Sequence, residues 1–226
     1  MIHLKSYWPR YISLDWGFQH HSAVYWFATD GDNVYCYRER VVNHKTAPEL
    51  ADVIIEATPE HERKAVKTLY AGPDIFSRKT SDRTISIEMD SRLAPHGFGF
   101  TGVSPAAAGP GDRKLGWALV YQLLKSGRLK ISPDCRELIK AIPQAIRDFP
   151  NHAEDVKKVD TVGDDCLDSF RYGLYTSSLT PRLPIELEAA RLVKVDFKEN
   201  PIAHYYQTKD ALADVRRRRG GMSFGR

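Results

Sequence analysis

Tyr11-Ile-Ser-Leu-Asp-Trp-Gly17 is the stretch that decides the fold, because it is an apolar strand that ends on an acidic residue close to a glycine. Leu14 and Trp16 flank Asp15, so we expect this strand to be buried. Burying a lone carboxylate without a partner is costly. A functional role for Asp15 is therefore favoured over the alternative, an acidic residue in a turn before Gly17.

The segments that follow have the pattern of a β-hairpin. Residues 22–28 and 33–42 are rich in aromatic and β-branched side chains, and Asp30-Gly-Asp32 between them is a turn signal. Together with residues 10–15, they predict three consecutive antiparallel strands.

A helix and a fourth strand are expected next. Thr46 is the candidate N-cap, with Glu49 as its capping-box partner, and the apolar stripe of the helix comprises Leu50, Val53, Ile54 and Ala57. Residues 65–71 predict the fourth strand, which leads to Asp74. Taken alone, Asp74 fits equally well as a residue that simply ends a strand.

The second half of the chain is expected to be mainly helical. Residues 75–111 are rich in Gly, Pro and Ser, so we expect a loop or flap over the site, with a short strand at 84–87. Periodic apolar residues then predict helices at 112–126 and 133–149, separated by a strand at 128–131. The first of these helices should bury Leu115, Leu119, Leu123 and Leu124, and the second Leu138, Ile139, Ile142 and Ile146.

The segment Gly163-Asp-Asp-Cys-Leu-Asp-Ser-Phe-Arg-Tyr-Gly-Leu174 starts a late helix and carries the last acidic residues. Asp164 is explained by capping or by a favourable charge at the helix dipole. Asp168 lies one turn further on, where capping does not explain it, and it shares a face with Asp165. We therefore expect Asp168 to be a main functional residue and Asp165 an auxiliary one.

Acidic residues from three separate elements gather at one site only at a large cost in repulsion, unless divalent cations neutralise them. Asp15, Asp74, Asp165 and Asp168 therefore predict a metal-dependent phosphoryl-transfer site, with nucleic acid as the expected substrate. Their oxygen ligands suit hard cations rather than zinc. Removing one carboxylate should relieve repulsion, so metal-free variants should melt no lower than the wild type.

Composition indicates one main domain. The chain has 226 residues, 42% of them hydrophobic and 27% charged, and its three cysteines are widely separated. No apolar run approaches the roughly 20 residues of a membrane span, and the first residues lack a signal-peptide core, so we expect a cytoplasmic protein without a membrane partner. We expect a nuclease domain over residues 1–180 and a C-terminal extension over 181–226.

The formal charge of +4 is concentrated at the C-terminal end. Residues 209–226 contain six Lys or Arg and two Asp, so their net charge equals that of the whole chain. We expect a disordered basic tail after about Asp214, which binds DNA phosphates or docks on a protein through Arg216, Arg217, Arg218 and Arg219. Lys114 and Arg113 are a second candidate DNA contact, although a solvated basic face explains them equally well.

These motifs resemble those of a known family. The order βββαβ, then αβα and a late helix, resembles the ribonuclease-H-like fold, an α/β fold with helices on both faces of a central mixed sheet. Asp15-Trp-Gly17, Gly72-Pro-Asp74 and Asp165-Cys-Leu-Asp-Ser-Phe-Arg-Tyr172 resemble motifs of the C-terminal nuclease domain of the large terminase subunit of tailed bacteriophages. The resemblance covers roughly residues 10–178 and includes Gly127-Arg-Leu-Lys-Ile131.

The resemblance implies a DNA endonuclease that cuts concatemeric viral DNA around genome packaging in the host cytoplasm. It implies two Mg²⁺ or Mn²⁺ ions bridged by Asp15, with Asp74 completing the shell of one ion and Asp168, helped by Asp165, that of the other. Many relatives have His at the position of Asp165. Arg171 is expected to brace the late helix by pairing with a site carboxylate.

The resemblance also implies partners: double-stranded DNA, a packaging ATPase domain or chain, the small terminase subunit and the portal. The sequence contains no G-x-x-x-x-G-K-[ST] loop, so we do not expect it to hydrolyse ATP by itself. Two alternatives stay open. One is another ribonuclease-H-like enzyme, such as a Holliday-junction resolvase or a transposase core, and the other is a non-catalytic packaging module that docks on DNA or protein.

Overall fold

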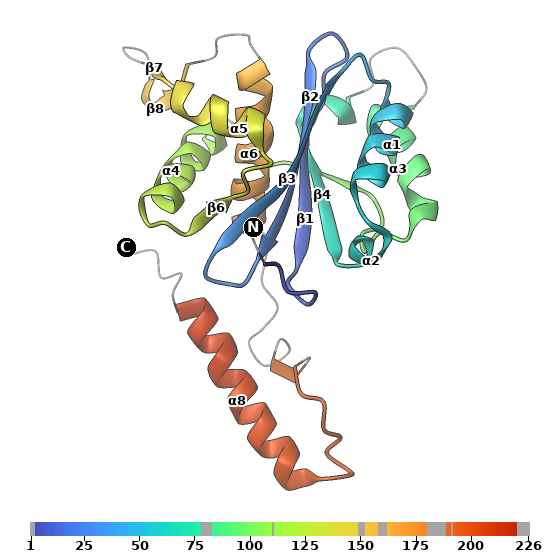
Figure 1. Cartoon of the computed structure of the whole chain (residues 1–226), viewed down its shortest axis with the longest axis vertical. Helices are drawn as coiled ribbons and strands as arrows, with labels where there is room; N and C mark the ends of the chain where they lie inside the picture. Colours follow the sequence, from blue (N-terminus) through green and yellow to red (C-terminus); the bar gives the residue numbers. More distant parts are fainter. Residues whose placement is uncertain are drawn as a thin grey trace. The chain divides into compact units, whose positions relative to one another are not determined.

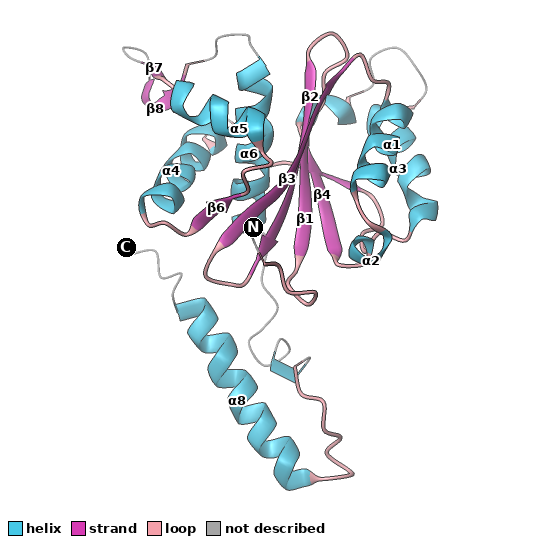
Figure 2. Cartoon of the chain, in the orientation of Figure 1, coloured by secondary structure: helices cyan, strands magenta, loops and turns pink. Residues whose placement is uncertain are grey.

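The computed structural model describes residues 3–77, 83–109, 111–148, 152–157, 162–179, 189–190 and 192–220. The chain divides into two compact units, residues 1–29 with 33–179 and residues 30–32 with 180–226. The larger unit is α/β (Figure 2) and holds the acidic residues Asp15, Asp74, Asp165 and Asp168.

A mixed six-stranded sheet forms the middle of the larger unit. Its strands are β1 (Arg10–Asp15), β2 (His21–Thr29), β3 (Val34–Asn43), β4 (Val66–Ala71), β5 (Val103–Pro105) and β6 (Leu129–Ile131), in the order β5-β4-β1-β2-β3-β6. β1, β2 and β3 are successive antiparallel neighbours, so the expected three-stranded arrangement is confirmed. β4 lies parallel to β1, β5 parallel to β4, and β6 parallel to β3.

Helices cover both faces of this sheet (Figure 1). α1 (Ala47–Ala57), α2 (Glu60–Arg63) and α3 (Ile85–Leu93) lie on one face, and α4 (Asp112–Lys125), α5 (Arg136–Ala141) and α6 (Val162–Leu179) on the other. Short 3-10 helices and a small hairpin complete the unit, namely η1 (Pro73–Phe76), η2 (Ala94–His96), η3 (Ile142–Gln144), β7 (Arg147–Asp148) and β8 (His152–Val156).

β1 is buried on both faces, because a helical layer packs on each. Leu14 points into the core shared with α1 and α3, and Tyr11 into the core beneath α6. Side chains alternate along a strand, so Ser13 and Asp15 lie on the same face as Tyr11. The hydroxyl of Ser13 lies 3.2 Å from that of Ser169 on α6. The strand therefore directs Asp15 toward α6.

The start of α1 agrees with the capping box expected from the sequence. The Glu49 carboxylate accepts hydrogen bonds from the backbone N–H of Thr46 at 2.9 Å and from its hydroxyl at 2.8 Å. These bonds lower the pKa of Glu49 below its usual value. Of the expected apolar stripe, Leu50, Ile54 and Ala57 are buried.

The expected loop over residues 75–111 is wrong in part, since it contains α3. Thr84 is the N-cap of this helix, and its hydroxyl accepts a bond from the Ile87 N–H at 3.4 Å. The alternation of apolar and polar residues in Thr84-Ile-Ser-Ile87 resembles that of a strand. The apolar residues that follow, Met89 and Leu93, are four positions apart, as on one face of a helix, and are buried against α1. The tertiary contacts of these later residues decide the helix.

The helix expected at 112–126 exists as α4, and its buried face differs in part from the expected one. Leu123 is buried as expected, and Leu119 packs against the core. Leu115 is 58% exposed and Leu124 is 39% exposed. The side that packs inward carries Gly116, Trp117, Val120 and Leu123. A small residue at the contact lets α4 approach α6 closely, so packing here follows Gly116 rather than the leucine-rich side.

The helix expected at 133–149 is shorter, because α5 ends at Ala141 and η3 follows. Pro143 lacks the N–H that a continuing helix would need. Ile146, expected to be buried, is 66% exposed. The start of α5 is fixed by Glu39 of β3, whose carboxylate accepts bonds from the N–H groups of Glu137 at 2.9 Å and Leu138 at 2.8 Å.

The smaller unit contains α8 (Pro201–Gly220), for which the sequence analysis gave no helix. A small hydrophobic cluster in this unit consists of Ala189, which precedes α8, and Ala211 and Val215 on α8, all of them buried. The backbone is helical from Pro201 to Gly220, which includes the first residues of the tail for which disorder was expected, and residues 221–226 lie outside the described part of the chain. Of the described helices, none has the length and apolar character to cross a membrane.

A network of charges ties α2 to the sheet. The carboxylate of Glu62 pairs with Arg10 of β1 at 2.8 Å and receives two hydrogen bonds from Arg38 of β3, both at 3.2 Å. Burial by itself would raise the pKa of Glu62, but the hydrogen bonds and charges of the two arginines outweigh it and lower the pKa. Because Arg10 is buried, its positive charge needs the negative charge of Glu62 to compensate for the loss of hydration.

Glu62→Gln is expected to lower the melting temperature at pH 7, because hydrogen bonds to charged groups each contribute about 1.5–3 kcal/mol. A lowered folded-state pKa stabilises the protein above the unfolded pKa of about 4.3, and this stabilisation is lost as the pH falls through the folded pKa. Thermal melts of wild type and variant should therefore converge in acid. Glu60→Gln on the same helix is the control, and a difference that persists undiminished below about pH 4 would contradict the pairing.

Candidate functional site

Asp15 lies where β1, β4 and α6 come together. β1 and β4 are paired up to Leu14 and Ala71, and the N–H of Gly72 donates to the Leu14 carbonyl at 3.0 Å. A Cβ on Gly72 would lie 2.9 Å from Oδ1 of Asp15 and 3.3 Å from Cε2 of Tyr172. The absence of a side chain at Gly72 thus leaves room for the carboxylate beside the tyrosine ring.

Asp168 is 5% exposed and is held by two arginines. Nη1 of Arg113 lies 2.6 Å from its Oδ1, and Nη2 of Arg171 lies 3.2 Å from the same atom. A carboxylate buried to this degree requires such partners, since an uncompensated buried charge costs several kcal/mol. Arg171 pairs with Asp168, as expected from the sequence, while the assignment of Asp168 to a functional site stays a prediction.

Arg113 does not project to solvent from the start of α4, as a DNA contact would. Its guanidinium also binds Oδ1 of Asp155 at 2.7 Å through Nε and the carbonyl of Val156 at 3.0 Å through Nη2. The side chain is 23% exposed. Arg113 therefore links α4 to α6 through Asp168 and to β8 through Asp155 and Val156.

Tyr172 is a shared neighbour of Asp15 and Asp168. Burial raises the pKa of the Tyr172 hydroxyl above its usual value, and the negative charges of Asp15 and Asp168 raise it further. The guanidinium of Arg171 lies 4.5 Å from the centre of the same ring. Two of the four expected acids are thus brought together around one aromatic side chain.

Asp165 binds backbone on the neighbouring strand. Its Oδ2 accepts a hydrogen bond from the N–H of His21, the first residue of β2, at 3.2 Å. Burial raises the pKa of Asp165, while this N–H and the charges of His20 and His21 oppose the increase. Asp165 thereby joins the first turn of α6 to the start of β2. Asp164 lies in the same turn, where its charge favours the helix dipole.

Asp74 lies on η1, two residues beyond Gly72, and its side chain is exposed. The topology agrees with the expectation that β1 and β4 end side by side. Within the described part of the chain, however, Asp74 does not join two of the other acids in a group that could hold a metal ion. Its place in the site therefore stays a prediction.

The four acids fit a hard cation in the chemistry of their donors, because carboxylate oxygens are preferred ligands of Mg²⁺ and Mn²⁺. The space at Gly72 and the shared neighbour Tyr172 bring Asp15 and Asp168 to one end of β1. Over the described residues, however, no three His, Cys, Asp or Glu side chains are gathered so that they could hold a metal ion together. A cation bound by Asp168 would share this carboxylate with Arg113 and Arg171, which both contact its Oδ1.

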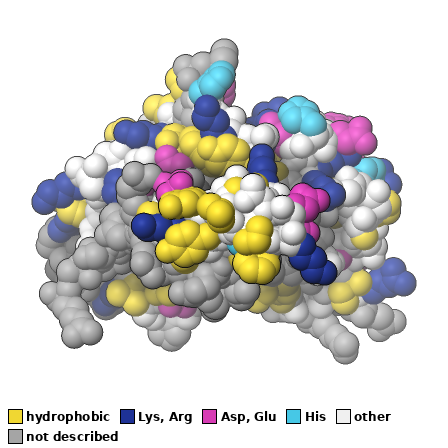
Figure 3. All heavy atoms as spheres, turned by 90° about the horizontal axis from the view of Figure 1, so that it is seen from below, with side chains coloured by type: hydrophobic (Ala, Val, Ile, Leu, Met, Phe, Trp, Pro, Cys, Tyr) yellow, Lys and Arg dark blue, Asp and Glu magenta, His cyan; other side chains and the backbone are white. Residues whose placement is uncertain are grey.

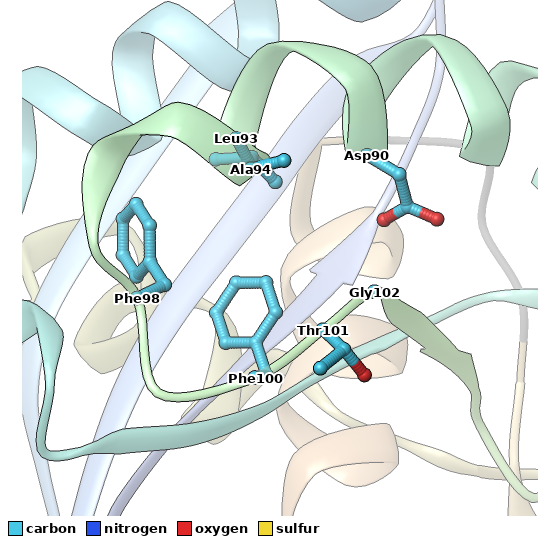
Figure 4. Close-up of a pocket in the computed structure, with 7 residues that line it drawn as sticks. All are labelled: Asp90, Leu93, Ala94, Phe98, Phe100, Thr101 and Gly102. Atoms are coloured by element: carbon cyan, nitrogen blue, oxygen red, sulfur yellow. The ribbon is translucent and has the colours of Figure 1, made fainter.

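A small cavity elsewhere in the unit does not extend the site. It lies between α3 and the segment before β5 and is lined by Asp90, Leu93, Ala94, Phe98, Phe100, Thr101 and Gly102 (Figure 4). Its volume of about 10 Å³ holds at most one water molecule. Oδ1 of Asp90 accepts a bond from the Val103 N–H at 2.7 Å, so this acid holds the edge strand β5.

Among the basic residues expected to contact DNA, the structure describes the side chain of Lys114 but not those of Arg216–Arg219. Lys114 lies on α4, half-buried, and α8 carries Arg216–Arg219, whose side chains lie outside the described residues. The face shown in Figure 3 mixes hydrophobic side chains with both positive and negative ones among its described residues. The described side chains of that face therefore present no field of a single sign.

Two partners of the site were missed by the sequence analysis. Gly116 gave a signal, because an isolated glycine inside a helical pattern usually has a packing reason. A Cβ at Gly116 would lie 2.8 Å from Cγ and 3.0 Å from Cδ of Arg171. For Asp155 the sequence contains no such signal, since the residue lies in a stretch without a periodic pattern of apolar residues.

Gly116→Ala is expected to lower the melting temperature, although alanine is the better helix former by about 1 kcal/mol. The added methyl overlaps the middle of a buried arginine side chain that Asp168 and Tyr172 hold in place, and overpacking of this kind costs about 1–3 kcal/mol. Gly111→Ala, where nothing lies within 4 Å of the new Cβ, is the control. A Gly116→Ala protein as stable as the control would mean that Arg171 moves freely.

Solved structures similar to this chain include nuclease domains of bacteriophage large terminases. The nuclease domain of the P22 large terminase aligns with 78% of this chain and 85% of its own length, with a TM-score of 0.58 and 17% sequence identity. The nuclease domain of g2p, the large terminase of bacteriophage SPP1, solved with bound Mn, aligns with 73% of this chain and 84% of its own, with a TM-score of 0.51 and 14% identity.

A large terminase from a thermophilic bacteriophage, solved in complex with ATP-gamma-S, aligns with 77% of this chain at a TM-score of 0.56 and 19% identity. The match covers 41% of that terminase, so this protein spans less than half of it. No protein-family model and no curated protein matches the sequence. The expected α/β, ribonuclease-H-like fold is confirmed, and the chain has the fold of the large terminase nuclease domains.

Proposed function

We propose that this chain is a metal-dependent DNA endonuclease that cuts concatemeric viral DNA during genome packaging. The observation that carries the proposal is the approach of Asp15 on β1 and Asp168 on α6 to the same residue, Tyr172, at one end of the sheet. The fold shared with terminase nuclease domains supports it. Acids from separate elements are an arrangement suited to phosphodiester hydrolysis with divalent cations.

Asp15, Asp74 and Asp168 are the proposed ligands of two Mg²⁺ or Mn²⁺ ions, with Asp165 in an auxiliary role. When bound, such ions activate a water molecule and stabilise the leaving oxygen. The residues of the chain prepare the site: Gly72 leaves space for the carboxylate of Asp15, and Asp165 fixes the start of β2 through the His21 N–H.

Contacts to DNA are proposed to go mainly to phosphates, through Lys114 and the arginines of α8, Arg216, Arg217, Arg218 and Arg219. Such contacts are independent of base sequence. Arg113 is left out of this set, because its guanidinium is bound to Asp155, Asp168 and Val156.

The proposed partners follow from the same comparison. The terminase solved with ATP-gamma-S is a large terminase of which this chain spans less than half. We infer that a packaging ATPase domain or chain acts with this nuclease on double-stranded DNA in the host cytoplasm. The small terminase subunit and the portal are further proposed partners.

Two observations favour a second candidate, a non-catalytic docking module. Asp168 is bound by two arginines, and the described residues contain no ready-made metal group. A nicking assay on supercoiled plasmid, with and without Mn²⁺, separates the two: the endonuclease cuts only with the metal, and the docking module does not cut. Cleavage of a four-way junction but not of linear duplex would favour a junction resolvase instead.

Asp15→Ala, Asp74→Ala and Asp168→Ala are each expected to reduce Mn²⁺-dependent plasmid nicking to background, because each removes a proposed cation ligand. Asp165→Ala should lose less activity, and Asp164→Ala, the matched control on the same turn, least. Full activity of Asp74→Ala would remove that exposed residue from the site.

The structure changes the expected stability of one of these variants. Asp168→Ala leaves Arg113 and Arg171 without their carboxylate, so its metal-free melting temperature should fall, by about 3–5 kcal/mol of stability. The expectation that an acid variant melts no lower than wild type is therefore kept for Asp15→Ala but not for Asp168→Ala. Asp168→Asn, which keeps an oxygen acceptor, allows activity to be measured in a better-folded protein.

Replacing Arg216–Arg219 together with glutamine is expected to weaken DNA binding and to flatten its salt dependence, by about 0.9 in the log–log slope for each phosphate that is no longer bound. This design is sharper than deletion of residues 209–226, which would cut α8 and remove the buried Ala211 and Val215. The four-lysine variant keeps the charge and is the control. An unchanged slope in the glutamine variant would rule out a DNA-binding arm and leave docking on a protein.

A further inference from the structure

Arg113 holds a position that the proposed chemistry does not explain. It lies in the first turn of α4 and connects Asp168 on α6, at 2.6 Å, with Asp155 on β8, at 2.7 Å. Both distances are those of short, charge-assisted hydrogen bonds. Arg113 thus supplies a positive charge closer to Asp168 than that of Arg171, which lies at 3.2 Å.

A guanidinium and a divalent cation act on Asp168 in opposite ways. Arg113 stabilises the carboxylate in the absence of metal, because the group is buried and would otherwise be poorly compensated. A dication that approaches the same carboxylate is repelled by the guanidinium. If it binds Oδ1, the oxygen that both arginines contact, it also competes with them for that atom. Each ligand of Asp168 therefore weakens the binding of the other.

The two arginines at Asp168 differ in their freedom to respond. Arg171 lies on α6 with its target, is buried beside Tyr172, and has its side chain pressed against Gly116. Arg113 is more exposed and has two other acceptors on β8, the Asp155 carboxylate and the Val156 carbonyl. If Asp168 turned to a cation, Arg113 would keep those two bonds.

We propose that Arg113 is a built-in counter-ion of Asp168 that competes with the catalytic cation, and that Asp155 holds Arg113 when the cation displaces it. Arg113 is then a positioning residue, since it acts through Asp168 and not on the substrate. The inference rests on the proposed function, because it requires that Asp168 binds a divalent cation. Its consequence is that metal-free stability and metal affinity respond to Arg113 with opposite signs.

The test measures Mn²⁺ binding by titration calorimetry and metal-free melting temperature by circular dichroism, on the full chain. Arg113→Gln is expected to melt lower than wild type but to bind Mn²⁺ more tightly, on the order of three- to tenfold, because one positive charge is gone from the site. Arg113→Lys should also melt lower, since an ammonium cannot span three acceptors, but its affinity should stay near that of wild type.

Asp155→Asn provides a variant of opposite sign. Without the negative charge of Asp155, the positive charge of Arg113 is compensated by Asp168 alone and repels a cation more strongly. The site also loses one nearby negative charge, so Mn²⁺ affinity should fall. Lys125→Gln removes one positive charge at the exposed far end of α4 and is the control for long-range effects, with affinity expected to stay at the wild-type value.

The outcomes separate the inference from the proposed function. Mn²⁺ affinity that is unchanged or weaker in Arg113→Gln, with wild type binding normally, overturns the inference alone and makes Arg113 a purely structural residue. Tighter binding in Lys125→Gln by the same factor also overturns it, since the effect would then be general. Absence of Mn²⁺ binding in wild type and in every variant overturns both the inference and the metal-dependent nuclease.

Discussion

The carboxylate of Asp168 is the group on which the arrangement of the site depends. Its ion pairs with Arg113 and Arg171 join α6 to α4, and through Arg113 the same network reaches β8. A charge at 5% exposure is tolerated only with such partners. The buried face of α4 fits this pairing: Gly116 lies against α6, where Arg171 occupies the space that a larger residue would need.

The second constraint is the burial of β1 on both faces. Residues of one parity pack against α1 and α3, and those of the other parity face α6, so the position of Asp15 follows from that of Tyr11 by simple alternation. β4 runs parallel to β1 and ends at the same level, which brings Gly72 against the Asp15 carboxylate. The position of Asp15 at the end of β1 thus determines that its side chain faces α6.

Local pattern was enough to predict the parts of the fold whose cause is local. The hairpin of β2 and β3 and the capping box of α1 depend on neighbouring residues, and the sequence predicted both. α3 was missed, because Thr84-Ile-Ser-Ile87 alternates like a strand until packing against α1 decides otherwise. Arg113 has the local pattern of a solvated base at a helix start, and only its long-range partners Asp155 and Asp168 reveal its structural role. The positions of the candidate acids could be read from the sequence, but their surroundings could not.

Those surroundings make the four acids unequal, although the sequence treats them as one cluster. Asp74 is exposed, Asp15 lies beside a glycine, Asp165 is bound to a backbone N–H, and Asp168 is held by two arginines. A carboxylate already held in an ion pair binds a cation against the positive charge of its partner, and this applies to Asp168 with its two arginines. In the proposed enzyme, recruitment of Asp168 is therefore the step at which stability is exchanged for metal binding.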